Sequence, residues 1–155
     1  MNQSDEPDGC CGVTHGCVFA KALLARTAAC ECADRRQAGE STAIGCRSPV
    51  AHHNCETLAA LFAERARFAF RLPASGRPLL HQQALRLQCG GLAALRAHLD
   101  DGDDQVAGAG GATDDVHCLV QAAQQRHGSL TDLPWADLVP RMQAWVPRPR
   151  RAPPR

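Results

Sequence analysis

Apolar side chains recur at helical spacing in two long stretches of the chain. Between residues 55 and 72 one side of a helix would carry Leu58, Leu61, Phe62, Ala69 and Leu72. Between residues 79 and 99 a second stripe contains Leu85, Leu92, Leu95 and Leu99. The pattern predicts two amphipathic helices. The first should begin after Asn54, whose side chain can accept a hydrogen bond from the first helical turn.

Three further helices are predicted from composition and shorter patterns. Residues 17–36 are rich in Ala, Leu and Arg and contain no Gly or Pro, which is typical of a helix. Apolar spacing predicts another helix from residue 116 to about residue 128. A short helix should follow Pro134, with Pro140 either distorting it or lying in its opening turn.

Glycine and proline indicate where the chain leaves or bends a helix. Three such residues predict a loop over residues 37–54: Gly39, Gly45 and Pro49. The adjacent Gly90 and Gly91 interrupt the helix predicted at residues 79–99. They predict a kink or a close packing contact there.

These elements predict an all-α fold, because no segment has a convincing strand pattern and no internal repeat is present. We expect a small bundle of about four to five helices, forming one domain at residues 17–147. Residues 1–16 should form a flexible tail, and residues 100–115 a flexible loop rich in Gly and Asp. Residues 148–155 should form an extended tail rich in Arg and Pro.

Charge and hydropathy argue against several classes of protein. The chain has 17 Lys and Arg against 16 Asp and Glu, so its net charge of +1 gives no field that attracts nucleic acid. No segment approaches the roughly 20 apolar residues of a membrane helix, so membrane insertion is not expected. The acidic N-terminal residues 1–8 lack the features of a secretion signal. We therefore expect a cytoplasmic protein.

Sequence motifs of common enzyme classes are missing from the chain. It contains no GxGxxG, Walker loop, GxSxG or HExxH motif. Nucleotide binding, serine hydrolysis and zinc proteolysis therefore lose their usual support. This favours an accessory protein over an enzyme.

Cysteine is the residue type that points to chemistry. The chain has nine cysteines among 155 residues, an odd number and more than packing requires. In a reducing cytosol this density is more typical of metal ligands or redox thiols than of disulfides. The alternative is that several of them simply fill a helical core of small side chains.

Several potential ligands lie between the end of the first predicted helix and the start of the second: Cys30, Cys32, Cys46, His52, His53 and Cys55. If these two helices form an antiparallel hairpin, the ligands gather at one end of it. We expect Cys30, Cys46 and Cys55 to be the first metal ligands, since Cys46 and Cys55 flank an irregular loop. A helix N-terminus should also lower the thiol pKa of Cys55.

The fourth ligand should come from one of three further cysteines, with two histidines as alternatives: Cys17, Cys32 or Cys89, and His52 or His53. In a continuous helix Cys17 and Cys30 would lie about 20 Å apart. They can share a site only if that helix is broken. Cys118, in the helix predicted from residue 116, is expected in the core.

Three or four thiolates with optional imidazoles suit either a [4Fe-4S] cluster or a tetrahedral zinc ion. The spacing does not choose between them, because the chain has neither paired CxxC motifs nor a CxxCxxC run. Thiol redox chemistry and simple core packing also remain open.

Four segments carry a resemblance to known proteins: GCVFAKALLAR, CRSPVAHHNC, LRLQCGGLAALRAHL and GSLTDLPW. With the closing arginines, and over roughly residues 16–151, the chain resembles a group of small, cysteine-rich, functionally unassigned proteobacterial proteins. The resemblance implies a companion of electron-transfer or nitrogen-fixation systems. It supplies no catalytic residues.

The expected function is therefore that of an iron–sulfur protein with a [4Fe-4S] cluster, which transfers electrons or assists a larger redox complex. Its partner should be a redox protein or such a complex. The alternatives are a zinc-stabilised interaction or regulatory module and a cytosolic thiol redox sensor.

Overall fold

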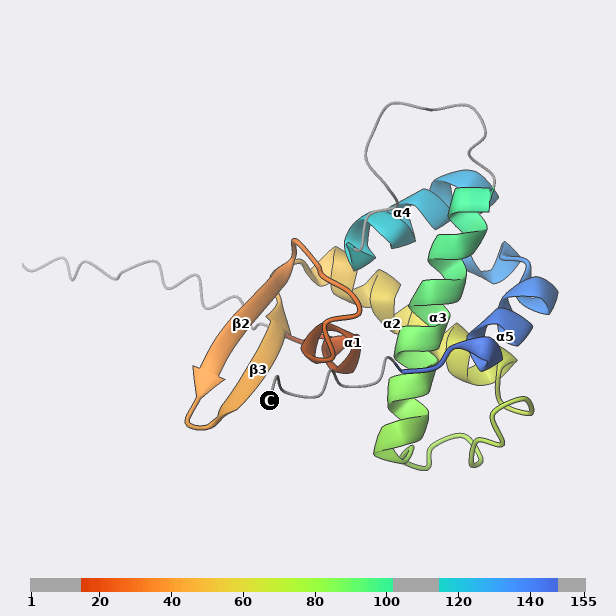
Figure 1. Cartoon of the computed structure of the whole chain (residues 1–155). Coiled ribbons are helices and arrows are strands. Elements are labelled where there is room, and N and C mark those ends of the chain that lie inside the picture. Colours follow the sequence, from red (N-terminus) through yellow and green to blue (C-terminus); the bar gives the residue numbers. More distant parts are fainter. Residues whose placement is uncertain (1–14, 102–114, 148–155) are drawn as a thin grey trace, which may run out of the picture.

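The computed structural model describes residues 15–101 and 115–147. Within them a group of helices lies beside a small antiparallel sheet (Figure 1). In chain order the elements are β1 (His15–Gly16), α1 (Ala20–Leu24), β2 (Ala33–Ala38), β3 (Ser41–Cys46), α2 (Pro49–Arg65), α3 (His81–Asp101), α4 (Val116–His127), the 3₁₀ helix η1 (Leu130–Asp132) and α5 (Trp135–Ala144). The described part is mainly helical, as predicted, but it is α+β, so the expectation of an all-α fold is wrong.

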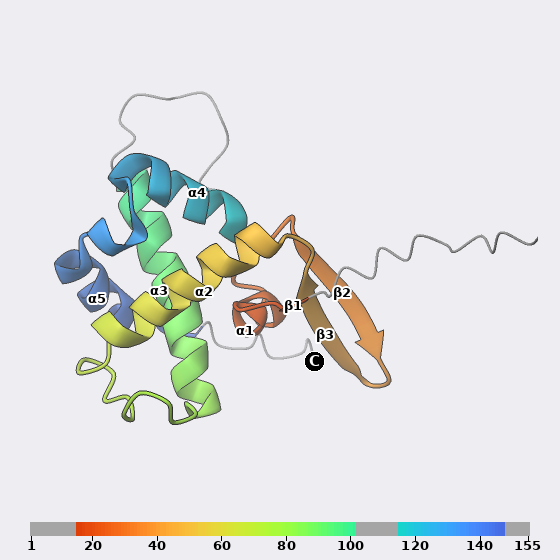
Figure 2. The same ribbon diagram turned by 180° about the vertical axis from the view of Figure 1, so that it is seen from behind.

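The sheet is a hairpin of β2 and β3, with β1 on the other edge of β3. β2 and β3 pair antiparallel from Ala33 opposite Cys46 to Ala38 opposite Ser41. Two residues join the strands, and the first of them, Gly39, has a φ of 65°, as tight hairpin turns require. Figures 1 and 2 show the hairpin extending from one side of the helices.

The strands lack the sequence signal that would have predicted them. Arg35 and Arg36 of β2 are exposed, so β2 shows no alternation of buried apolar and exposed polar residues. In β3 only Ile44 and Cys46 are buried. The residues of β2 therefore resemble a helix in composition, although pairing with β3 makes them a strand.

α1 ends after five residues, so the helix expected over residues 17–36 is wrong. Arg26 has a φ of 58°, in the left-handed region that stops a helix. The amide and the hydroxyl of Thr27 both donate to the Ala22 carbonyl at 3.1 Å, which closes the helix end. The chain then leaves for β2, so the 20 Å separation that a continuous helix imposes on its cysteines does not arise.

α2 begins before the predicted start at Asn54. The Ser48 side chain accepts a hydrogen bond from the Ala51 amide at 3.2 Å, and Pro49 occupies the first helical position. The expected loop over residues 37–54 is therefore wrong. That segment contains the hairpin turn, β3 and the opening turns of α2.

α2 also ends at Arg65, earlier than the predicted end at Leu72. Backbone turns follow, in which Arg71 has a φ of 51°. The apolar pattern continues past the helix because Phe70 and Leu72 still pack against the hydrophobic core from these turns. Apolar residues that pack against the core from these turns therefore continue the helical spacing beyond the end of α2.

The helices predicted near residues 79–99, near residues 116–128 and after Pro134 are confirmed as α3, α4 and α5. Asp115 is the N-cap of α4, and its carboxylate accepts an amide hydrogen bond at 3.0 Å. Pro140 lies inside α5. The 3₁₀ helix η1, which the sequence did not predict, connects α4 to α5.

The expected tails at residues 1–16 and 148–155 and the expected loop at residues 100–115 lie mainly outside the described residues. Where residues of these segments are described, they belong to β1, to the end of α3 and to the N-cap of α4.

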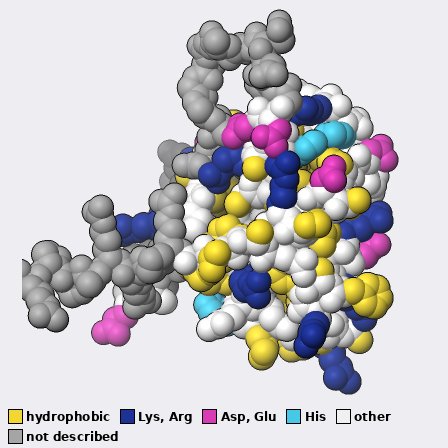
Figure 3. Space-filling view, turned by 45° about the vertical axis from the view of Figure 1, so that its right-hand side comes forward, with side chains coloured by type: hydrophobic (Ala, Val, Ile, Leu, Met, Phe, Trp, Pro, Cys, Tyr) yellow, Lys and Arg dark blue, Asp and Glu magenta, His cyan; other side chains and the backbone are white. Residues whose placement is uncertain are grey.

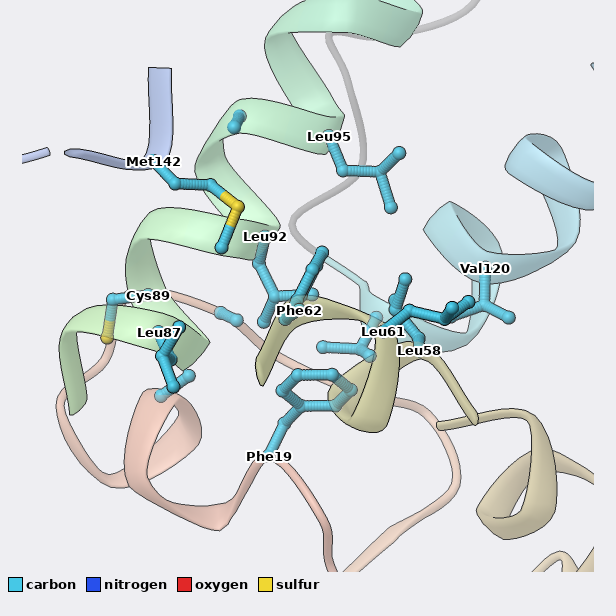
Figure 4. Packing of buried hydrophobic residues seen from close by; sticks show 14 of the residues in the cluster. Phe19, Leu58, Leu61, Phe62, Leu87, Cys89, Leu92, Leu95, Val120 and Met142 are labelled. Carbon is cyan, nitrogen blue, oxygen red and sulfur yellow. The ribbon is translucent and has the colours of Figure 1, made fainter. Parts of the chain in front are cut away.

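α3 is the helix around which the others pack, since it contacts α1, α2, α4 and α5. Figure 4 shows Phe19 and Phe62 among the leucines of α2 and α3. Phe62 makes edge-to-face contacts with Phe19 at a centroid distance of 6.2 Å and with Trp135 at 6.0 Å. A Cβ placed on Gly91 would lie 2.4 Å from the Phe62 ring. The close packing contact predicted at the paired glycines is therefore confirmed.

None of the described helices is long and apolar enough to cross a membrane. On the face drawn in Figure 3, Lys and Arg side chains are interspersed with Asp and Glu and with hydrophobic side chains. Neither sign of charge dominates this face, in agreement with the net charge of +1.

We predict that Gly91→Ala lowers the free energy of unfolding by about 1–3 kcal/mol, the usual cost of overpacking a core. The added methyl group would meet the buried Phe62 ring, which Phe19 and Trp135 hold in place. Ala is otherwise about 1 kcal/mol more favourable than Gly in a helix. Without the contact, the substitution should raise the free energy of unfolding. A decrease, measured by urea unfolding, therefore indicates that the added methyl group meets the Phe62 ring.

Gly16→Ala is the control, because a Cβ at Gly16 meets no atom within 4 Å. We expect it to change the free energy of unfolding by less than about 0.5 kcal/mol. A Gly91→Ala protein as stable as the unchanged chain, or more stable, would contradict the described packing.

Candidate metal centre

Four cysteines from separate parts of the chain line one pocket. Cys17, Cys30, Cys46 and Cys55 all border the same cavity. The other lining residues are mostly apolar, with two histidines: Val18, Phe19, Ala33, Gly45, Ala51, Val116, His52 and His117. We call this cavity the four-thiol pocket.

Each thiol of the pocket comes from a different segment of the chain. Cys17 follows β1, and its amide donates to the Ile44 carbonyl of β3 at 2.8 Å. Cys30 lies in the turn before β2, Cys46 is the last residue of β3, and Cys55 lies within α2. The hairpin and α2 therefore bring together cysteines that are distant in the sequence.

The N-terminus of α4 holds the turn that carries Cys30. The Asp115 carboxylate, which caps α4, also accepts a hydrogen bond from the Glu31 amide at 2.6 Å. The Val116 amide donates to the Ala29 carbonyl at 2.9 Å. One carboxylate thus connects the helix end to the cysteine turn.

Arg47, directly after β3, holds the other side of the same turn. Its guanidinium donates to the Glu31 carbonyl at 2.6 Å, and its amide donates to the Cys32 carbonyl at 2.9 Å. Because both flanks of the turn are hydrogen-bonded, its side chains project from a fixed backbone.

Burial in the pocket favours protonated thiols. It raises the pKa of Cys17 and of Cys30, and it raises the pKa of Cys55 to about 12. The neighbouring thiol groups raise the pKa of each further, because negative charges close together repel one another. These groups therefore become thiolates together only if a bound cation compensates their charge.

The expectation that Cys55 opens a helix and has a lowered pKa is wrong. α2 begins at Pro49, so Cys55 lies in the second turn, beyond the reach of most of the helix-dipole effect. Burial then dominates and raises the pKa of the thiol.

Backbone amides donate to two of the pocket sulfurs. The Phe19 amide donates to the sulfur of Cys17, and the amides of Cys32 and His117 donate to the sulfur of Cys30. These bonds lower the thiol pKa of each, but by less than burial raises it. They stabilise negative charge on the sulfurs once the thiols are ionised.

The structure places the other predicted ligands outside the set of four thiols. Cys32 adjoins the pocket, and burial followed by the nearby thiols raises its pKa to about 11. Cys89 is buried in the hydrophobic core on α3, where its sulfur accepts a hydrogen bond from the Thr27 hydroxyl at 3.2 Å. Cys118, expected in the core, is half-buried on α4.

Both predicted histidines lie in α2 and not in a loop, which corrects their expected placement. His52 lines the pocket, and its Nε2 lies 3.1 Å from the Gly16 carbonyl oxygen. Its ring also lies against that of His15, with centroids 4.8 Å apart. His53 is exposed. His52 is therefore the predicted histidine that adjoins the thiols.

Two sets of three potential ligand atoms lie within 4.8 Å of one another in the described part of the chain. They are Glu31, Cys32 and His117, and Glu31, Asp115 and Cys118. Neither set includes a thiol of the four-thiol pocket. Glu31 and His117 could not be predicted as ligands, because the turn before β2 and the start of α4 are distant in the sequence.

No protein-family model matches the chain, and neither a curated protein nor a solved structure matches it. What the residues establish is a cysteine-rich protein with groups that can hold a metal ion.

We predict that the metal-free protein loses stability as the pH rises above 9. The pKa of Cys55 rises from an ordinary 9.0 to about 12 on folding, so the folded state favours the protonated thiol. The corresponding stabilisation is complete below pH 9 and is lost as the pH approaches about 12. Urea unfolding of the reduced, chelator-treated protein between pH 8 and about 11 measures this loss.

Cys55→Ala removes the titrating group, so its free energy of unfolding should fall less steeply over the same pH range. Cys118→Ala, whose thiol is outside the pocket, should retain the slope of the unchanged chain. Equal slopes for the unchanged chain and Cys55→Ala would show that burial of this thiol does not control the pH dependence.

Proposed function

We propose that the chain binds an iron–sulfur cluster of the four-iron type through Cys17, Cys30, Cys46 and Cys55. The observation that carries this proposal is the convergence of four thiols, from four separate segments of the chain, on one mostly apolar pocket. Four cysteine thiolates are the usual ligands of a [4Fe-4S] cluster. The amides that donate to the sulfurs of Cys17 and Cys30 are a further feature of such sites, where they tune the reduction potential.

The spacing of the sulfurs supports a cluster over a single zinc ion. In a tetrahedral site with zinc–sulfur bonds of about 2.3 Å, the sulfurs lie only about 3.8 Å from one another. The pocket thiols do not belong to the sets of ligand atoms that lie within 4.8 Å of one another. A cluster of several irons is wider than one ion, and therefore suits ligands that are farther apart.

The raised thiol pKa values argue against a redox sensor that works through free thiols. Reactive cysteines depend on a lowered pKa, because the thiolate is the nucleophile. Burial raises the pKa of Cys17, Cys30 and Cys55 instead. Metal ligation requires no free thiolate, since the cation displaces the proton.

The role that fits such a centre is electron transfer or assistance to a larger redox complex. A bound cluster supplies reversible single-electron chemistry. The apolar side chains of Val18, Phe19 and Val116 exclude water from the pocket. Backbone amides donate hydrogen bonds to the sulfurs of Cys17 and Cys30. In this role the chain exchanges electrons with a protein redox partner, as the resemblance to companions of electron-transfer systems also implies.

We predict that the full chain, purified without oxygen, is brown and contains iron and sulfide in about equal amounts. Its visible absorption should bleach on addition of dithionite. Replacing any one of Cys17, Cys30, Cys46 or Cys55 with Ser should remove most of the iron, because each supplies one of four ligands. Iron and sulfide analysis with visible spectroscopy measures both results.

Cys89→Ala is the matched control, because Cys89 is a buried thiol in the hydrophobic core outside the pocket. It should retain the iron of the unchanged chain. One zinc ion per chain that depends on the same four cysteines would replace this proposal with a zinc-stabilised interaction module. A colourless protein that also fails to take up iron and sulfide in reconstitution would overturn the cluster.

A further inference from the structure

A second group of ligands lies at the edge of the four-thiol pocket and includes none of its four thiols. The ligand atoms of Glu31, Cys32 and His117 all lie within 4.8 Å of one another. Glu31 and Cys32 are neighbours in the turn before β2, whereas His117 lies in the first turn of α4. We call these three residues the rim triad, because His117 also lines the pocket while Glu31 is exposed to solvent.

We propose that the rim triad binds one zinc ion, separate from the group held in the four-thiol pocket. The triad offers one sulfur, one imidazole nitrogen and one carboxylate oxygen, which are the three kinds of ligand that zinc accepts in proteins. Three protein ligands leave a fourth tetrahedral position for water. The exposed side of Glu31 gives that position access to solvent.

The backbone around the triad is already held in place. The Glu31 amide donates to the Asp115 carboxylate at 2.6 Å, and the Glu31 carbonyl accepts from the Arg47 guanidinium at 2.6 Å. The same carboxylate caps α4 and thereby orients the turn that carries His117. His117 Nε2 lies 3.8 Å from Glu31 Oε1, so small side-chain movements suffice to bring both atoms to one ion.

The second set of ligand atoms, Glu31 with Asp115 and Cys118, is the weaker candidate. Both oxygens of Asp115 already accept amide hydrogen bonds, from Glu31 at 2.6 Å and from Cys118 at 3.0 Å. Using them as zinc ligands would compete with the bonds that cap α4 and hold the cysteine turn. The rim triad makes no such demand on its carboxylate.

A zinc ion in the rim triad would connect the Cys30 turn to α4, two segments that line the four-thiol pocket. Zinc bound to the folded state should therefore stabilise the protein near the pocket without taking a pocket ligand. This inference does not depend on the cluster, since none of the three ligands is one of the four pocket thiols.

The test uses Co²⁺ as a spectroscopic substitute for zinc, titrated into the reduced, metal-free full chain. In the Cys17→Ser chain, whose pocket lacks one thiol, the bound Co²⁺ should show a single sulfur neighbour in its X-ray absorption. Cys32→Ser and His117→Asn should each weaken that binding by more than about tenfold, since even outer-shell changes cost that much at metal sites. Cys118→Ser, which affects only the weaker set, should leave it unchanged.

Cys17→Ser separates this site from the pocket. It should lose whatever ion or cluster the four thiols hold, yet retain the Co²⁺ that depends on Cys32. The inference is overturned if no Co²⁺ binding depends on both Cys32 and His117, or if Cys118→Ser abolishes the binding. It is also overturned if the Cys32-dependent ion has several sulfur neighbours, because that ion would belong to the pocket. If only the iron–sulfur proposal is wrong, the protein will be colourless but will still bind Co²⁺ at the site with a single sulfur neighbour.

Discussion

Four thiols that face one apolar pocket impose the main physical constraint on this molecule. Burial and mutual repulsion raise the pKa of Cys17, Cys30 and Cys55, so these three thiols favour the protonated form unless a cation compensates their charge. As protonated groups they are small apolar side chains, and as thiolates they are a strong soft ligand set. The two states differ in charge, and a bound metal centre is what makes the second state stable.

The fold around the pocket meets this constraint through short, tightly connected segments. The break after α1 frees the chain to reach the Cys30 turn, and the hairpin returns it to Cys46. Asp115 and Arg47 then hold the turn from opposite sides with bonds of 2.6 Å to Glu31. The hydrophobic core around α3 contains Cys89, so this cysteine is not one of the pocket thiols.

The helices that bury a continuous apolar stripe were predictable from the sequence, as α3 shows. The hairpin was not, because the exposed Arg35 and Arg36 give β2 no alternating pattern, and pairing with β3 decides its structure. The sequence singled out all four pocket cysteines as candidates, but it could not choose Cys17, since that choice required the helix break at Arg26. Glu31 and His117 had no signal at all, because only the docking of α4 onto the cysteine turn brings them together.

The central claim is that the four pocket thiols hold one shared metal centre. Mass spectrometry after alkylation of the anaerobically purified full chain, with and without a strong chelator, tests it residue by residue. The account predicts that Cys17, Cys30, Cys46 and Cys55 are protected together and become reactive together when the metal is removed. The account would be contradicted if these four cysteines stayed protected from alkylation after the metal is removed. It would also be contradicted if they became reactive one by one.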